Sequence, residues 1–91
     1  MRLKFFATYR DITHRKEEDI PAPSDVRALF FSLGERYGAA MRLKLYSPDG
    51  TDIGDETIIL VNGRNVCHIA GIDTPLAETD TVSVFPVVAG G

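Results

Sequence analysis

Near the middle of the chain, apolar residues recur with the spacing of one helix face, and this stripe constrains the fold more than any other feature. The stripe consists of Val26, Leu29, Phe30, Leu33 and Tyr37. Spacings of three and four place side chains on one face of an α-helix. Ser24 or Asp25 supplies an N-cap, and Gly38 is a natural stop. We therefore predict an amphipathic helix of about three to four turns, whose apolar face needs a second layer to cover it.

Alternating segments at the two ends of the chain predict a sheet that forms this second layer. Residues 3–9 alternate, with Leu3 and Phe5 on one face and Phe6 on the other. Residues 81–85 alternate in the same way, with Val82 and Val84 opposite Phe85. A helix laid across one face of a mixed sheet is the simplest way to bury the stripe. The predicted class is therefore α+β.

The intervening segments supply further elements. Residues 16–20 follow a polar turn at 11–15 and are charged enough for an edge strand, and 57–61 is a β-branched strand that ends at Asn62-Gly63. Residues 42–46 alternate like a short strand before a turn at 47–50. Residues 66–72 predict a short strand and then a helical turn, followed by another turn at 73–76. Pro86 lacks an N–H group, so we expect strand pairing to weaken there and a flexible tail to begin at residue 87.

Length and composition restrict the class of protein. Ninety-one residues, of which 44% are hydrophobic and 25% charged, predict one globular domain over 1–91. The longest apolar runs have four residues, which argues against a membrane span. A net charge of −3 without a basic stripe argues against a nucleic-acid partner. A single cysteine, Cys67, and an N-terminus without an apolar signal core favour a cytoplasmic location.

The side chains do not form a recognisable active site. His14 and His68 are far apart in sequence, and only Cys67 lies beside either of them, so no metal-ligand spacing is present. The acidic run 17–19 is interpreted as a solvated strand edge, and the glycines form no phosphate-binding motif. We therefore expect this chain itself to bind no metal or cofactor.

The C-terminal pair Gly90-Gly91 is the remaining candidate for chemistry. Glycine lacks a Cβ, so a glycine backbone passes through slots too narrow for other residues. The Gly91 carboxylate is a poor electrophile until it is activated, and the chain has no ATP-binding motif. A partner enzyme that uses ATP and Mg²⁺ would have to adenylate it, after which sulfide or an amine displaces AMP. The alternative is a terminus without function.

Several short motifs follow one another along the chain in a definite order and spacing. The first motif is Phe5-Phe6-Ala7 followed by Arg10, and the second is Val61-Asn62-Gly63. Later come Asp73-Thr74-Pro75-Leu76, then Asp80, Val82 and Phe85-Pro86, and finally Val88-Ala89-Gly90-Gly91. In order and spacing, these motifs resemble the ubiquitin-like sulfur carriers of the MoaD and ThiS families, and most closely the MoaD group. The resemblance covers most of the chain.

This resemblance implies a β-grasp fold in which the first and last strands pair in parallel at the sheet centre. It also implies that an E1-like enzyme of the MoeB or ThiF type adenylates Gly91 and that a thiocarboxylate follows. The large molybdopterin synthase subunit, of the MoaE type, would use this sulfur in molybdenum cofactor biosynthesis. The chain would then be the non-catalytic small subunit of that synthase.

Pairing of the end strands would also bring Phe6 and Phe85 together on the sheet face away from the helix. This pair, with the following Pro86, Val87, Val88 and Ala89, is the predicted partner-binding surface. A loop that covers the two rings is the alternative.

Three other functions remain open. The sulfur could serve thiamine, cysteine or homocysteine synthesis. The chain could be a modifier that is joined through Gly91 to lysines of other proteins. It could also be a binding module whose tail has no role.

Overall fold

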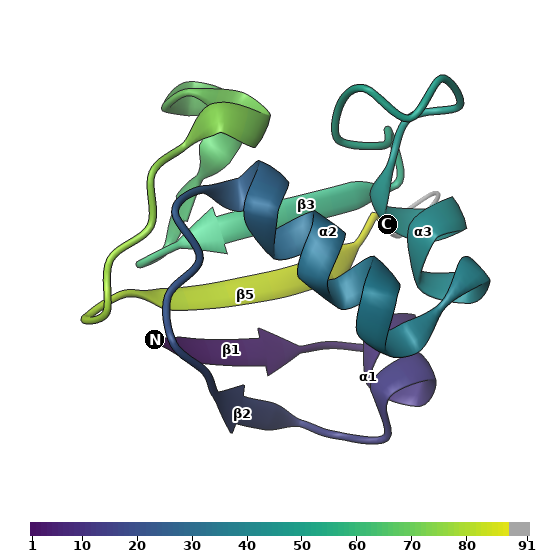
Figure 1. The fold of residues 1–91 in the computed structure, drawn as a ribbon, viewed down its shortest axis with the longest axis horizontal. Coiled ribbons are helices and arrows are strands. Elements are labelled where there is room, and N and C mark those ends of the chain that lie inside the picture. The colour runs from purple at the N-terminus through teal and green to yellow at the C-terminus, as the bar shows by residue number, and fades with distance from the viewer. Residues whose placement is uncertain (88–91) are drawn as a thin grey trace.

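The computed structural model describes residues 1–87 and has helices packed on one face of a five-stranded sheet (Figure 1). The strands are β1 (Arg2–Phe5), β2 (Glu17–Asp19), β3 (Thr57–Val61), β4 (Arg64–Asn65) and β5 (Thr81–Pro86). Their order across the sheet is β2-β1-β5-β3-β4. β1 and β5 are parallel, and the other three pairs are antiparallel. The mixed sheet with a parallel central pair is the predicted β-grasp arrangement.

The helix predicted from the apolar stripe is α2 (Val26–Tyr37). The Asp25 side chain caps it by accepting a hydrogen bond from the Ala28 N–H at 2.8 Å. Gly38 ends the helix with a φ of 80°, a conformation that favours glycine. The stripe packs on the core face of the central strands, where Leu3, Phe5, Val82 and Val84 are fully buried.

Residues 3–9 do not form one continuous strand, because a helix starts within them. β1 ends at Phe5, Ala7 takes a φ of 52°, and α1 (Thr8–Thr13) follows. The polar turn expected at 11–15 therefore lies mostly in α1. Tyr9 still reaches the core, with 1% of its surface exposed, but it does so from the helix.

Two buried hydroxyl groups tie α1 to the rest of the fold. The Thr57 hydroxyl donates to the Lys44 carbonyl, so the short hydrogen bond between Tyr9 and Thr57 uses the Tyr9 proton. Burial raises the pKa of Tyr9. The phenol therefore stays protonated and remains a donor at neutral pH.

The strand expected at 42–46 is also wrong, because this segment belongs to α3 (Ala39–Leu45). Met41 and Leu45 lie one turn apart and are buried, whereas Leu43 between them is 83% exposed. The turn at 47–50 is confirmed, with the Gly50 N–H donating to the Ser47 carbonyl at 2.8 Å. Residues 66–72 contain the predicted helical turn but no strand, since η1 (Val66–His68) and η2 (Gly71–Asp73) are both 3₁₀ turns.

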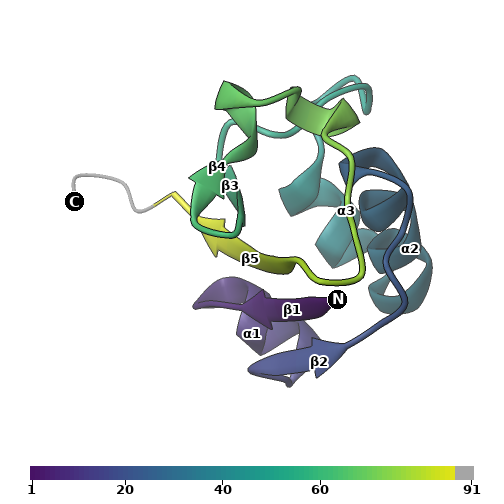
Figure 2. The ribbon, with the colours of Figure 1, turned by 90° about the vertical axis from the view of Figure 1, so that its left-hand side faces the viewer.

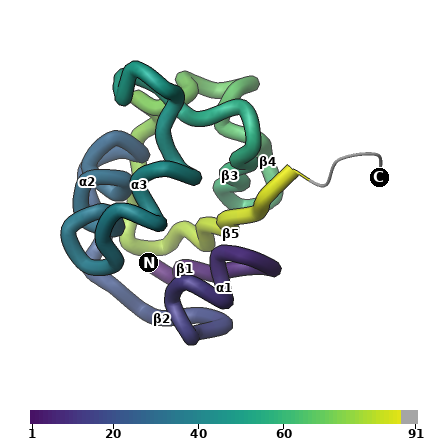
Figure 3. Tube along the Cα trace, turned by 90° about the vertical axis from the view of Figure 1, so that its right-hand side faces the viewer, coloured from purple at the N-terminus to yellow at the C-terminus, as the bar shows by residue number. Residues whose placement is uncertain are grey.

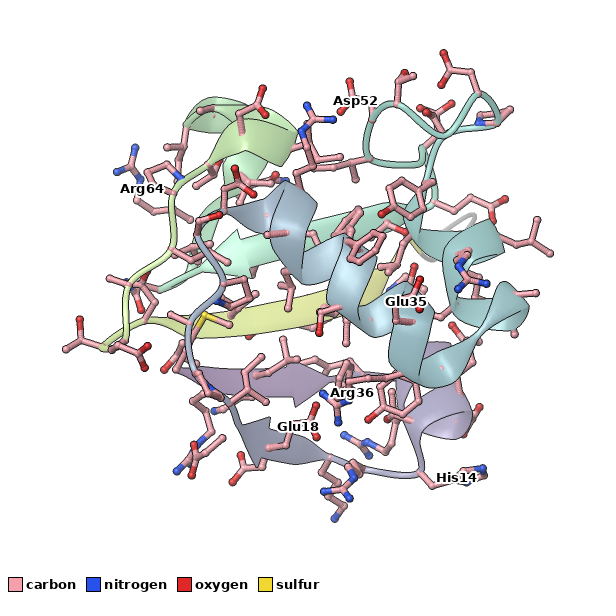
Figure 4. The ribbon with its side chains drawn as sticks, viewed as in Figure 1. His14, Glu18, Glu35, Arg36, Asp52 and Arg64 are labelled. Atoms are coloured by element: carbon pink, nitrogen blue, oxygen red, sulfur yellow. The ribbon has the colours of Figure 1, made fainter. Side chains whose placement is uncertain are left out.

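The edge strand β2 is fixed to α2 by a charged pair. Figure 4 shows Glu18 and Arg36 facing each other between these elements. Both Arg36 terminal nitrogens donate to the Glu18 carboxylate, at 2.7 and 2.8 Å. The Glu18 side chain is 7% exposed, so the acidic run 17–19 is not wholly a solvated edge. Such a bidentate, partly buried pair holds a short edge strand in place.

Gly54 occupies a site with no room for a side chain. A Cβ at this position would lie 2.8 Å from the Tyr46 carbonyl oxygen, a backbone atom that cannot rotate away. We expect Gly54→Ala to lower the free energy of unfolding by about 2 kcal/mol in urea titrations. Gly34→Ala is the matched control, because its Cβ would meet only the flexible Arg42 side chain, at 3.0 Å. Equal urea midpoints for the two variants would contradict this account.

Candidate functional site

Phe6 and Phe85 lie together on the sheet face opposite the helices. Their rings are stacked, with centroids 4.1 Å apart and planes inclined by 9°. Alternation along β5 sends Val84 into the core and Phe85 to the other face. Phe6 follows the buried Phe5 and points to the same outer face, so the parallel β1–β5 register brings the two rings into contact. The predicted juxtaposition is confirmed.

Two side chains of β3 extend this aromatic pair. Ile58 lies directly opposite Phe85 in the β3–β5 pairing, and Leu60 is two residues further along the same face. Ile58, Leu60, Phe6 and Phe85 are all half-buried, and we call these four residues the outer patch. Figure 2 shows α2 and α3 on the other side of the sheet. Sequence reasoning missed Ile58 and Leu60, although alternation within 57–61 places them opposite the buried Ile59.

β5 carries the outer patch directly to the C-terminal segment. The strand continues through Pro86, which pairs with Thr57, and the Val87 N–H donates to the Glu56 carbonyl at 2.7 Å. The expectation that pairing weakens at Pro86 is therefore wrong. Figure 3 shows this end of β5 on the side away from α2.

The position of Pro86 in the ladder explains why a proline is tolerated. Val87 directs its N–H toward β3, and backbone groups alternate in direction along a strand, so the nitrogen of Pro86 faces the β1 side. No β1 strand lies beside Pro86, because β1 ends at Phe5. The hydrogen bond from the Phe6 N–H to the Val84 carbonyl, at 3.1 Å, closes the β1–β5 ladder before Pro86 is reached. The missing N–H thus costs no sheet hydrogen bond.

The other residues of the predicted site are only partly covered by the structure. Pro86 is half-buried and Val87 is 46% exposed. Val88, Ala89, Gly90 and Gly91 lie outside the described residues. The predicted binding roles of all these residues remain predictions.

Charged side chains beside the outer patch on β1 and β2 are largely paired with one another. Arg2 Nε donates to Asp19 at 2.8 Å, and Arg2 also contacts Glu17 at 3.2 Å. The hydrogen bond from Arg2 holds the pKa of Asp19 below its ordinary value. Arg2, Glu17 and Asp19 therefore compensate one another, whereas Lys4 forms no ion pair within residues 1–87.

The residues considered for conventional chemistry are not brought together. His14 follows α1, while Cys67 and His68 lie in η1 at the opposite edge of the sheet, and Cys67 is exposed. Among residues 1–87, no cluster of three or more His, Cys, Asp or Glu side chains is arranged to hold a metal ion. In the same part of the chain, no helix is long and apolar enough to span a membrane.

Comparison with known proteins identifies the family. The model of the ThiS family matches residues 3–91. Small archaeal modifier protein 3 of Haloferax volcanii is 37% identical over 97 residues, covering 100% of this chain and 98% of that protein. The solution structure of small archaeal modifier protein 1 from Methanosarcina acetivorans has a TM-score of 0.81 at 26% identity, covering 99% of this chain and 94% of that one.

A second solved structure is similar along nearly its whole length. A Pyrococcus furiosus protein assigned as molybdopterin converting factor, subunit 1, has a TM-score of 0.68 at 29% identity, covering 96% of this chain and 95% of that one. These matches agree with the parallel β1–β5 pair at the sheet centre. The chain therefore belongs to the ThiS/MoaD family of ubiquitin-like, β-grasp sulfur carriers.

Proposed function

We propose that this protein carries sulfur as a C-terminal thiocarboxylate on Gly91 and delivers it for molybdopterin synthesis. The single observation that carries the proposal is the position of the outer patch. Its stacked rings lie immediately before the segment that leads to Gly91, on an open sheet face. A partner that binds this face would receive the C-terminal segment at the same time.

The chemistry requires two steps at the Gly91 carboxylate. In the first, a carboxylate oxygen attacks the α-phosphate of ATP, which forms an acyl adenylate and releases pyrophosphate. In the second, sulfide attacks the carbonyl carbon and AMP leaves, which yields the thiocarboxylate. An E1-like enzyme of the MoeB or ThiF type supplies the ATP and Mg²⁺ site, and this chain contributes the docking surface and the carboxylate.

Two observations favour molybdopterin synthesis as the destination of the sulfur. The Pyrococcus furiosus protein assigned as a molybdopterin converting factor subunit matches 96% of this chain. The motifs from Phe5 to Gly91 also resemble the MoaD group more closely than ThiS. A large synthase subunit of the MoaE type would then bind the outer patch after the activating enzyme has left.

A second candidate function is conjugation to other proteins. It is favoured by the 37% identity to small archaeal modifier protein 3 along the full chain. The activation step is shared, and the difference is the nucleophile. A lysine amine that displaces AMP forms an isopeptide bond, which leaves the chain attached to its target.

Mass spectrometry of the protein isolated from its own cells distinguishes these two functions. We expect a species heavier by about 16 Da, as one carboxylate oxygen is replaced by sulfur. Capture with an affinity-tagged chain should also recover a large synthase subunit. A C-terminal remnant of this chain on lysines of other proteins, without the heavier species, would instead support the modifier function. After trypsin this remnant is residues 65–91, because Arg64 is the last lysine or arginine of the chain. Finding neither species in cells that express the activating enzyme would contradict both functions.

A further inference from the structure

A groove at the opposite edge of the sheet from β2 is separate from the outer patch. β4 pairs only with Leu60 and Val61, so within residues 1–87 the first half of β3 has no strand beside its outer edge. After Asn65 the chain turns into η1, because the Asn65 side chain accepts the Cys67 N–H at 3.0 Å. The edge strand therefore stops early and leaves a gap along β3.

This gap is a cavity of about 510 Å³, within the usual size range of ligand-binding pockets. One wall is the loop from Asp52 to Asp55, and the other is the segment from Asn65 to Gly71. Its apolar lining residues are Ile53, which is partly exposed, and the buried Ile59 and Val66, and the exposed Cys67 also lines it. We call this cavity the acidic groove.

The charge of the groove has one sign. Asp52 and Asp55 line it and are exposed, and no lysine or arginine lines it. Neither carboxylate forms an ion pair in the part of the chain that the structure describes. The charge of Asp52 acts on Arg27, but the Arg27 guanidinium already forms an ion pair with Asp73, with 2.9 Å between Nη2 and Oδ1. Figure 4 shows Asp52 on the loop above β3, at the periphery of the molecule.

We propose that the acidic groove binds an extended segment of a partner protein that carries a lysine or arginine. The backbone of the segment would lie along β3 where β4 stops, as in recognition by strand addition. The aliphatic stem of the basic side chain would pack on the partly exposed Ile53, and its charged head would reach Asp52 and Asp55. The Asp52 carboxylate accepts the Ile53 N–H at 2.7 Å, and neither it nor Asp55 has a cationic partner within residues 1–87, so a long, cationic side chain matches this site.

The groove is also close to the C-terminal segment. Asp55 immediately precedes Glu56, whose carbonyl accepts the Val87 N–H at 2.7 Å. A partner held in the groove would therefore lie near the start of that segment while the outer patch remains free. This second surface does not depend on the chemistry proposed for Gly91.

A peptide titration of the full chain followed by amide NMR tests the proposal. The probe is an acetylated, amidated heptapeptide of alternating valine and lysine, and glutamate replaces lysine in the control peptide. We expect the lysine peptide to shift the amides of Thr57, Ile59, Val66 and Cys67, and the glutamate peptide to leave them unchanged. Equal binding of the two peptides, no binding at millimolar concentration, or shifts confined to the outer patch would overturn the proposal.

Variants locate the binding determinants. Replacing both carboxylates, as Asp52→Asn with Asp55→Asn, should weaken binding of the lysine peptide roughly five- to tenfold, the effect of two exposed ion pairs. Asp11→Asn with Glu35→Gln removes the same charge from exposed sites elsewhere and should have little effect. An equal loss in this control would show that only net charge matters and would overturn the proposal.

Chemical labelling gives a test that leaves both carboxylates intact. Cys67 is the only cysteine and is exposed, so a bulky maleimide attaches there alone. We expect the labelled protein to lose binding of the lysine peptide, and Phe85→Asp to retain it. Retained binding after complete labelling would overturn the groove assignment without affecting the proposal for Gly91.

Discussion

Gly91→Ala is expected to reduce adenylation by the cognate E1-like enzyme on the order of a hundredfold while the thermal midpoint of unfolding stays unchanged. The physical reason is positional, because the carboxylate must reach the α-phosphate of ATP through the channel of the enzyme. One added methyl group at the reacting residue displaces the carbonyl carbon, and a misplacement of about 1 Å costs on the order of a hundredfold in rate. ATP–pyrophosphate exchange measures the adenylation step directly.

Stability should not change because the core lies elsewhere in the chain. The buried hydrophobic residues of the described part run from Met1 to Val84. Gly34→Ala is the control for the chemical change itself, and it should leave pyrophosphate exchange at the level of the unmodified chain. Normal exchange with Gly91→Ala would mean that the terminal residue is not the activated group. A large drop in its thermal midpoint would show instead that Gly91 supports the fold.

The elements that could be predicted from sequence are those in which local pattern and tertiary burial agree. α2 has an apolar stripe, the capping residue Asp25 and a glycine stop, and all three indicate the same helix. In β5, Val82 and Val84 are buried and Phe85 is not, as alternation predicts. The stacking of Phe6 on Phe85 then followed from pairing the two end strands, a contact that no local pattern contains.

The predictions failed where one pattern fits two structures. A continuous strand over 3–9 would bury Tyr9 on the same face as Leu3 and Phe5, and α1 buries it as well. What decides for the helix is the positive φ of Ala7, directly before α1 begins. Alanine gives no signal for that conformation. In α3 the alternation from Arg42 to Tyr46 puts Leu43 and Leu45 on one face, yet only Leu45 is buried. Packing of Met41 and Leu45 one turn apart decides the helix.

The acidic groove had no sequence signal at all. Asp52 and Asp55 lie in the loop before β3, and Val66 and Cys67 lie after β4. Only the early end of β4 separates these two walls and opens the space between them. A two-residue strand is below what periodicity can detect, since alternation needs about four residues to be recognised.

Phe85→Asp is expected to weaken binding of the activating enzyme by about 3 kcal/mol while lowering the free energy of unfolding by only about 1 kcal/mol. Aromatic anchors at the centre of an interface commonly contribute more than 2 kcal/mol, and a carboxylate on an apolar patch adds a desolvation cost. Within the folded chain Phe85 is half-buried, so the change removes mainly its stacking on Phe6. Isothermal titration calorimetry and urea denaturation measure the two quantities independently.

The matched control is Phe31→Asp, which makes the same chemical change on the helix side of the molecule. Phe31 is 67% exposed and lies on α2, away from the outer patch. If the outer patch is the docking surface, Phe31→Asp should keep the affinity of the unmodified chain, and Phe85→Leu should recover most of it because an apolar side chain still fills the contact. Unchanged affinity with Phe85→Asp would place the enzyme on another surface. Equal losses with Phe31→Asp and Phe85→Asp would show that added negative charge, rather than the aromatic stack, controls the encounter, because Phe31 is not part of that stack.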